Sequence, residues 1–282
     1  CLTACKTEKK PADYVNPIIG ATTFDEFKGS YHGLGKTFPG VCTPFGLVQL
    51  SPDTKTGGDN GSGYSWHHKT IEGFSFTHMS GVGWYGDLGN FLVMPTTGTL
   101  KTFKGTEEEP ESGYRSRYSH EREQASAHKY TVMLDDYQIQ AELAAAPRSG
   151  IIRFTYPKSD TSRIQIDLAR RIGGSSTEQY VEVVDNHTIK GWMKCTPNTG
   201  GWGDGQGKAD YTVYFHCCFD KPLKNFGVWS ADIPDEADRK NASNDNPAYF
   251  EYIKNAKVLP MQKSAQGKHL GFYTEFPTEE GE

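Results

Sequence analysis

The chain has 282 residues, with 30 basic and 35 acidic side chains and a net charge of −5. Lys and Arg are not gathered in a stripe, so the sequence offers no electrostatic footprint for nucleic acid, and no stretch reaches the roughly 18 apolar residues of a transmembrane helix. A mean hydropathy of −0.64 with 31 Gly, 15 Pro and 12% aromatic residues is typical of many short strands and turns.

The amino-terminal residues predict export. Leu2-Thr3-Ala4-Cys5 precedes the polar run KTEKKPAD, and a Cys after small residues resembles a bacterial lipobox. Cys5 would carry the lipid, so we expect a signal remnant and linker over 1–14. The protein would be exported and lipid-anchored in the periplasm or at the bacterial cell surface, meeting the membrane only through that anchor. The alternative is a frayed terminus with incidental cysteines.

Past residue 20 the apolar residues recur with period two, which indicates strands with one buried face. Twelve strands are expected, at 46–51, 71–77, 90–94, 130–134, 139–145, 150–156, 163–168, 180–184, 188–194, 211–219, 223–229 and 269–276. Tyr211–Phe219 is apolar on both sides and would lie centrally in its sheet. A short helix is expected near Tyr249–Ala256. These elements predict an all-β fold, a large two-sheet antiparallel β-sandwich over 15–282.

Two Gly-rich segments interrupt this rhythm. GKTFPGVCTPFGLVQLSPDT (35–54) combines Pro and Gly in a rigid loop that we expect to be anchored on a sheet edge. The segment 62–98 contains a sharp Gly-rich loop with His78, Trp84 and Asp87. Aromatic rings that stack on the C–H face of a sugar, beside short polar side chains for its hydroxyls, are typical of carbohydrate sites.

Several polar residues have more than one interpretation. A ligand contact and a hydrogen-bonded structural role are equally open for His78. Asp53 is predicted to be a turn or capping residue, and Asp87 either to face a ligand or to hold its own loop. His67-His68 is expected at the surface, and Arg170-Arg171 is expected to make a surface or inter-domain contact and not to form an anion site. Glycoside hydrolysis needs two carboxyl groups at a defined separation, which the sequence does not provide, so neither aspartate is assigned as acid or base.

As a set, NPIIG, TFPG, PFG, QLSPDT, GFSFTHMSGVGWYGDLGN and TVYFHCCFDKP are similar to the N-terminal domain of the family 92 glycoside hydrolases, the calcium-dependent exo-α-mannosidases. The resemblance runs from about Val15 to Phe276, in order. It implies a large β-sandwich followed by an (α/α)6 barrel that this sequence lacks. The sequence ends in FPTEEGE, directly after a predicted strand, with no pattern for a further strand that would complete the sandwich. We therefore expect a chain truncated at both ends.

The resemblance also implies the chemistry. An inverting hydrolysis of terminal α-linked mannose in glycans would use acid, base and Ca²⁺ ligands that lie mainly in the barrel, so no catalytic or metal residue is expected in this fragment and the fragment alone would be inactive. The chain would contribute substrate walls and contact its own barrel. The candidate substrate-binding residues are Phe38, Tyr64, His78, Trp84 and Asp87.

The sequence departs from the family where many relatives carry GTGGHGHTFPG, because it reads ATTFDEFKGSYHGLGKTFPG. It also has TGGDNGSGY where a Trp, and often a Cys, is expected before SGY. Both changes affect the expected linkage preference. The alternative hypothesis is a non-catalytic carbohydrate-binding surface lipoprotein.

Overall fold

The computed structural model describes residues 9–21, 36–54, 62–80, 88–196, 210–239 and 246–282. In these ranges the strands pair in antiparallel sheets, and the only α-helix is α1 (Pro247–Ile253). The predicted all-β sandwich is therefore confirmed.

The largest sheet has eight strands in the order β1-β2-β4-β5-β11-β20-β17-β18. Ile166, Phe272 and Val228 lie in register on three neighbouring strands and are buried, which makes one side of this sheet a core face. The strands are β1 (Val41–Cys42), β2 (Gln49–Asp53), β4 (Gly73–Ser75), β5 (Leu92–Thr97), β11 (Ser159–Asp167), β20 (Leu270–Thr278), β17 (Asn225–Ser230) and β18 (Lys257–Pro260).

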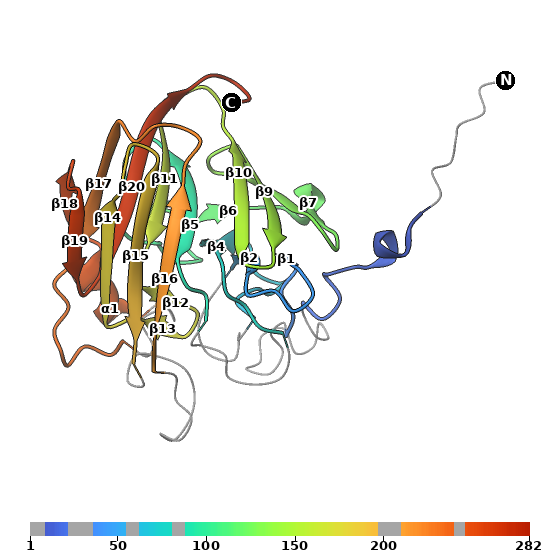
Figure 1. The fold of residues 1–282 in the computed structure, drawn as a ribbon, viewed down its shortest axis with the longest axis horizontal. Coiled ribbons are helices and arrows are strands. Elements are labelled where there is room, and N and C mark those ends of the chain that lie inside the picture. The colour runs from blue at the N-terminus through green and yellow to red at the C-terminus, as the bar shows by residue number, and fades with distance from the viewer. Residues whose placement is uncertain (1–8, 22–35, 55–61, 81–87, 197–209, 240–245) are drawn as a thin grey trace.

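Two four-stranded sheets pack on this sheet. The first has the order β16-β15-β14-β19 and lies in front of β11 and β20 in Figure 1. Its Ile189 and Met193 pack in one apolar cluster with Ile166, Val228 and Phe272 of the large sheet. The second has the order β10-β9-β8-β7, and its Tyr130 and Leu143 pack with Phe74. The strands are β16 (Tyr211–Cys218), β15 (Thr188–Cys195), β14 (Glu178–Val183), β19 (Ser264–Gly267), β10 (Ser149–Thr155), β9 (Ile139–Ala146), β8 (Tyr130–Leu134) and β7 (Glu123–Ala125).

Short elements complete the fold. Two two-stranded ribbons pair β3 with β6 and β12 with β13. The 3₁₀ helix η1 is the blue coil that stands away from the body in Figure 1. The bounds are β3 (Thr70–Ile71), β6 (Ser116–Arg117), β12 (Arg170–Arg171), β13 (Gly174–Ser175), η1 (Pro11–Tyr14), η3 (Pro110–Ser112) and η4 (His120–Arg122).

The helix α1 begins where its sequence provides a cap. The Asn246 side chain accepts hydrogen bonds from the amides of Ala248 and Tyr249, at 3.1 and 3.4 Å, and Pro247 occupies the first turn. Its buried Tyr249, Phe250 and Ile253 form a third apolar cluster. The short predicted helix is thus confirmed, although it starts earlier than expected. Among the described residues, no helix has the length and apolar character needed to cross a bilayer.

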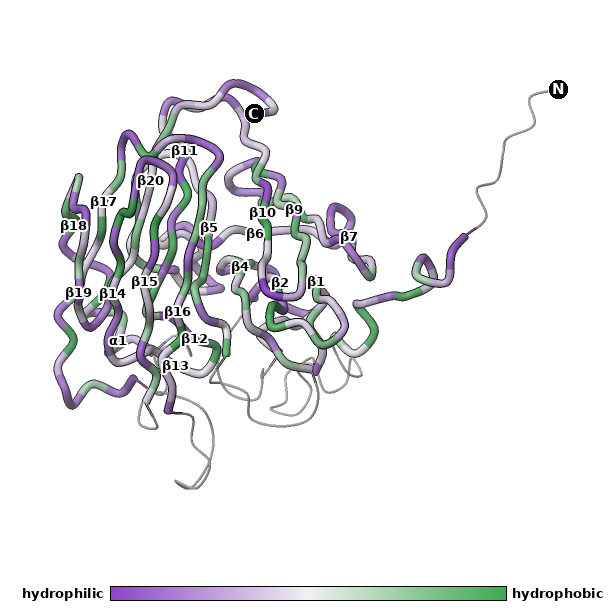
Figure 2. The backbone as a smooth tube through the Cα atoms, viewed as in Figure 1, coloured by the Kyte–Doolittle hydropathy of each residue, from purple (hydrophilic) through white to green (hydrophobic). Residues whose placement is uncertain are grey.

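Each of the twelve predicted strands overlaps an observed strand, and Tyr130–Leu134 matches in both bounds. The prediction for Tyr211–Phe219 was wrong, because β16 is an edge strand whose outer side chains are exposed. Buried and less buried residues alternate along β8 and largely along β15, as one-sided burial requires, whereas β4 and most of β5 are buried on both faces. Figure 2 shows the hydropathy of each residue along these strands.

The Pro/Gly segment closes the edge of the large sheet, as predicted. β1 pairs with β2 through Val41 and Leu50. Gly40 comes just before this pairing, and a Cβ atom there would lie 2.1 Å from the Leu50 carbonyl oxygen and 2.5 Å from the Ser51 Cα. The Gly of TFPG is therefore required by close approach of two backbones. Phe45, in the same segment, is fully exposed at a φ of 59°.

Candidate functional site

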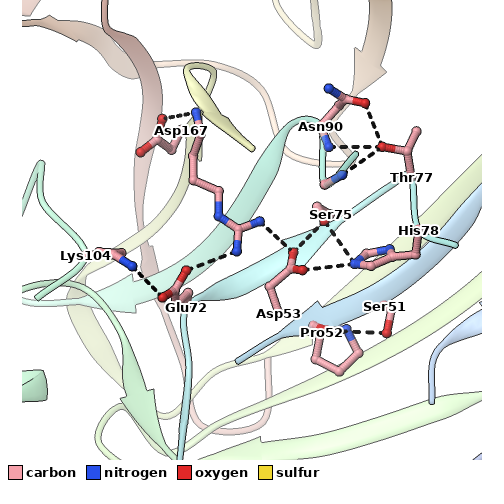
Figure 3. Close-up of polar contacts among 12 residues, drawn as sticks. Ser51, Pro52, Asp53, Glu72, Ser75, Thr77, His78, Asn90, Lys104 and Asp167 are labelled. Carbon is pink, nitrogen blue, oxygen red and sulfur yellow. Dashed lines mark hydrogen bonds and ion pairs between the residues drawn. The ribbon is translucent and has the colours of Figure 1, made fainter. Parts of the chain in front are cut away.

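Polar side chains converge where β2 and β4 end and β12 passes (Figure 3). Asp53 ends β2, Ser75 ends β4, His78 follows three residues later, and Arg170 belongs to β12. All four are at most 4% exposed. The sheet register therefore assembles one buried cluster from segments far apart in the sequence.

Both carboxylate oxygens of Asp53 are engaged. Ser75 Oγ donates to Oδ2 at 2.5 Å, and Arg170 Nη1 lies 3.1 Å from the same oxygen. His78 Nε2 lies 3.0 Å from Oδ1. Gly63 passes so close that a Cβ there would be 2.3 Å from Oδ1, and its φ is +82°. Asp53 is thus an anchor that holds the surrounding segments together.

His78 is fixed from both sides of its ring. Its Nδ1 donates to the Gln49 carbonyl oxygen at 2.7 Å, because a carbonyl oxygen can only accept. Its Nε2 faces Asp53 Oδ1 and lies 3.2 Å from Ser75 Oγ. The half-buried Phe38 ring lies over this imidazole, with centroids 5.5 Å apart and 39° between the planes. An aromatic ring and an imidazole are therefore held together beside a buried carboxylate.

Arg170 links this cluster to a second carboxylate, Glu72, which is fully buried. Arg170 Nη2 lies 3.0 Å from one Glu72 oxygen, while Lys104 Nζ and Arg115 Nη2 lie 2.7 and 2.8 Å from the other. Burial alone would raise the pKa of Glu72, but the three cations outweigh it and lower that pKa from 4.5 to about 2. The result is a buried chain of alternating charge.

The structure brings Phe38 and His78 together but places Tyr64 elsewhere. Tyr64 is 0% exposed, and its hydroxyl donates to the Glu123 carboxylate at 2.9 Å. Tyr130 donates to the same carboxylate at 2.6 Å. This buried position does not favour a sugar contact for Tyr64, which stays a prediction. Trp84, Asp87 and Cys5 lie outside the described residues.

Three expectations for polar residues were wrong. Asp53 is a buried ion-pair centre, not a turn residue, and Arg170 and Arg171 are buried, not on the surface. His68 is also buried, with its Nδ1 2.8 Å from Thr54 Oγ1. Burial of the Asp53 and Arg170 charges is possible because these two residues, which are distant in sequence, form an ion pair with each other.

A small cavity of about 20 Å³ opens beside this cluster, with Asp167, Arg170, Ser175 and His269 in its lining. It has room for about one water molecule, so it is not a sugar pocket. Within the described part of the chain, no three His, Cys, Asp or Glu side chains gather so that they could hold a metal ion. These residues therefore do not fit a Ca²⁺ site.

We expect Glu72→Gln to destabilise the protein strongly, because it removes the buried charge that three buried cations share. The free energy of unfolding should fall by about 3–5 kcal/mol in urea denaturation. Glu111→Gln is the matched control, since Glu111 pairs with Arg117 while the two side chains are 67% and 50% exposed, and an exposed pair is worth about 1 kcal/mol at most. Equal losses in the two variants would contradict the central role of Glu72.

The lowered pKa of Glu72 also predicts a pH dependence. The unfolded chain binds the Glu72 proton near pH 4.5 and the folded chain only near pH 2, so this stabilisation is complete above pH 4.5 and is lost as the pH falls towards 2. Between about pH 5 and about pH 3, wild type should lose about 2 kcal/mol more free energy of unfolding than Glu72→Gln. Parallel pH profiles of the two proteins would rule this out.

Comparison with known proteins shows which family and which solved structures this chain resembles. A sequence model of the glycosyl hydrolase family 92 N-terminal domain matches residues 14–282. The family GH92 alpha-mannosidase BT3965 from Bacteroides thetaiotaomicron matches with a TM-score of 0.76 and 35% identity, covering 98% of this chain and 32% of that chain. Its complex with mannoimidazole matches with a TM-score of 0.75 and 35% identity, covering 97% and 31%.

The family GH92 inverting mannosidase BT2199 from Bacteroides thetaiotaomicron VPI-5482 shares the fold, with 22% identity and a TM-score of 0.66 over 98% of this chain and 31% of that chain. A comparison with curated protein sequences gives no match. The chain spans about a third of the length of these solved relatives. Because the family's sequence model covers nearly all of it, from residue 14 to residue 282, the chain belongs to glycoside hydrolase family 92 and corresponds to its N-terminal domain.

Proposed function

We propose that this chain is the N-terminal domain of an exo-α-mannosidase that removes terminal α-linked mannose from glycans with inversion. The observation that carries the proposal is the family match over residues 14–282. It is supported by 35% identity to an alpha-mannosidase that was also solved with mannoimidazole. The acid, the base and the Ca²⁺ ligands would come from an (α/α)6 barrel beyond this chain.

The geometry supports a positioning role for the chain. Phe38 presents a half-buried ring, and His78 beneath it is fixed by the Gln49 carbonyl and by Asp53. The Phe38 ring, which lies against the fixed His78 imidazole, can stack on a sugar without losing much side-chain entropy. Asp53 is fully buried and both its oxygens are occupied, so it supports the site and does not exchange protons with substrate.

We expect the 282-residue chain alone to show no turnover of a fluorogenic α-mannoside. A polypeptide extended through the barrel should hydrolyse it with inversion, seen by proton NMR of the released sugar, and a chelator should abolish this activity.

In that extended polypeptide, Phe38→Ala should lower kcat/KM about tenfold, which corresponds to the loss of about 1.4 kcal/mol of transition-state stabilisation. The matched control is Tyr252→Ala, a 40% exposed aromatic residue on α1.

Chelator-sensitive turnover by the 282-residue chain alone would show that the chemistry lies in this domain, and would contradict the proposal. Binding of mannan by the extended polypeptide without any hydrolysis would favour the non-catalytic carbohydrate-binding lipoprotein.

We also propose that the protein is exported and lipid-anchored through Cys5, as the sequence LTAC before a polar linker suggests. In a bacterial host that processes lipoproteins, the wild-type chain expressed with a complete lipoprotein signal sequence before Cys5 should incorporate labelled palmitate and sediment with membranes. Cys5→Ser should lose both properties, whereas Cys42→Ser, at an exposed cysteine, should keep them. Equal labelling of the two variants would remove Cys5 as the lipidation site.

A further inference from the structure

The sheet β16-β15-β14-β19 presents three aromatic residues in one row. Tyr180 on β14 is directly opposite Trp192 on β15, and Trp192 is directly opposite Tyr214 on β16. Trp192 points away from the core, because successive side chains of a strand alternate between its faces and Ile189 and Met193, at odd-numbered positions of β15, are fully buried on the inner face. We call these three residues the aromatic row.

The aromatic row is exposed and geometrically fixed. Tyr214 is 71% exposed, and Tyr180 and Trp192 are partly exposed. The rings of Tyr180 and Trp192 are nearly parallel, with 20° between their planes and centroids 6.1 Å apart. Three adjacent strands give the row a length of about 10 Å. The ladder of β14, β15 and β16 fixes the backbone, so binding would order little beyond the side chains.

Hydrogen-bonding groups flank the aromatic row on both sides. Some are already oriented: Lys190 Nζ lies 2.9 Å from Glu182, to which the Tyr180 hydroxyl also donates, and the Gln266 amide donates to Glu178 at 2.8 Å. The flanking positions, in register across the same three strands, are Glu182, Lys190 and His216 on one side and Glu178, Lys194 and Thr212 on the other.

This pattern distinguishes between two kinds of partner. The core of a protein interface is depleted of charged residues, whereas here the residues two positions before and after each ring on its strand are charged or polar. A protein partner would have to bury those groups at a cost. A neutral glycan has C–H faces for the rings and hydroxyls that both donate and accept, so it can satisfy carboxylates and ammonium groups alike.

We propose that the aromatic row is a binding surface for neutral glycan chains, with Trp192 and Tyr214 as the stacking residues. It belongs to a different sheet from Phe38 and His78, which lie beside the edge of the eight-stranded sheet. The row therefore goes beyond the proposed function: it needs no catalytic group, and it would hold a neutral polysaccharide near the enzyme.

Affinity electrophoresis of the 282-residue chain tests the proposal, with soluble yeast mannan or a soluble β-glucan cast in native gels. Wild type should be retarded by at least one of the two polysaccharides. Tyr214→Ala and Trp192→Ala should each raise the dissociation constant about tenfold, as expected for the loss of one aromatic contact. Tyr252→Ala, at an exposed aromatic residue outside the row, should bind as wild type.

Tyr214→Ala keeps the test decisive if Trp192→Ala fails to fold, because Tyr214 is exposed on an edge strand. No retardation of wild type, or equal retardation of wild type and Tyr214→Ala, would overturn the proposal. So would self-association in sedimentation that Tyr214→Ala abolishes, in the absence of glycan binding. Tyr214-dependent retardation by either polysaccharide supports it, even if the extended polypeptide proves to have no mannosidase activity.

Discussion

The buried charge of Glu72 is the constraint on which the arrangement of this domain depends. A carboxylate out of contact with water is tolerated only if cations replace its hydration, and Lys104, Arg115 and Arg170 do so from three separate segments. Each of these segments must therefore reach the same point before the charge can be buried. Arg170 in turn contacts Asp53, so the position of His78 and of the Phe38 ring depends on the same chain of ion pairs.

Much of the fold could be predicted from the sequence, because one-sided burial leaves a period-two pattern that is local. The elements that were missed are mainly two to four residues long, such as β1, β13 and β18, and their pairing depends on neighbours that no short pattern specifies. β16 was misplaced for a different reason. Its outer face includes Tyr214, and an aromatic ring counts as apolar in a pattern whether it is buried in a core or exposed to solvent.

The site was less predictable than the fold. The Gly-rich context drew attention to His78, but Asp53 is 25 residues away from it and Arg170 is 98 residues from Glu72. Ion pairs between residues so far apart leave no characteristic residue spacing in the sequence. A local signal did exist in TIEGFSF, where Glu72 is the only charged residue and lies between β3 and β4. A charge in a buried segment requires a partner, and a pair of arginines shortly after another buried strand was available.

The complete burial of Asp53 and Glu72 limits the chemistry in which these two carboxylates can take part. A general acid or base must exchange a proton with the substrate or with water, but Asp53 and Glu72 are 0% exposed and their oxygens are engaged by cations or donors. Both carboxylates therefore serve to fix geometry. In the proposed mannosidase, residues that contact a sugar would lie on the exposed side of this support, as the half-buried Phe38 ring does, and the acid and the base would be residues other than Asp53 and Glu72.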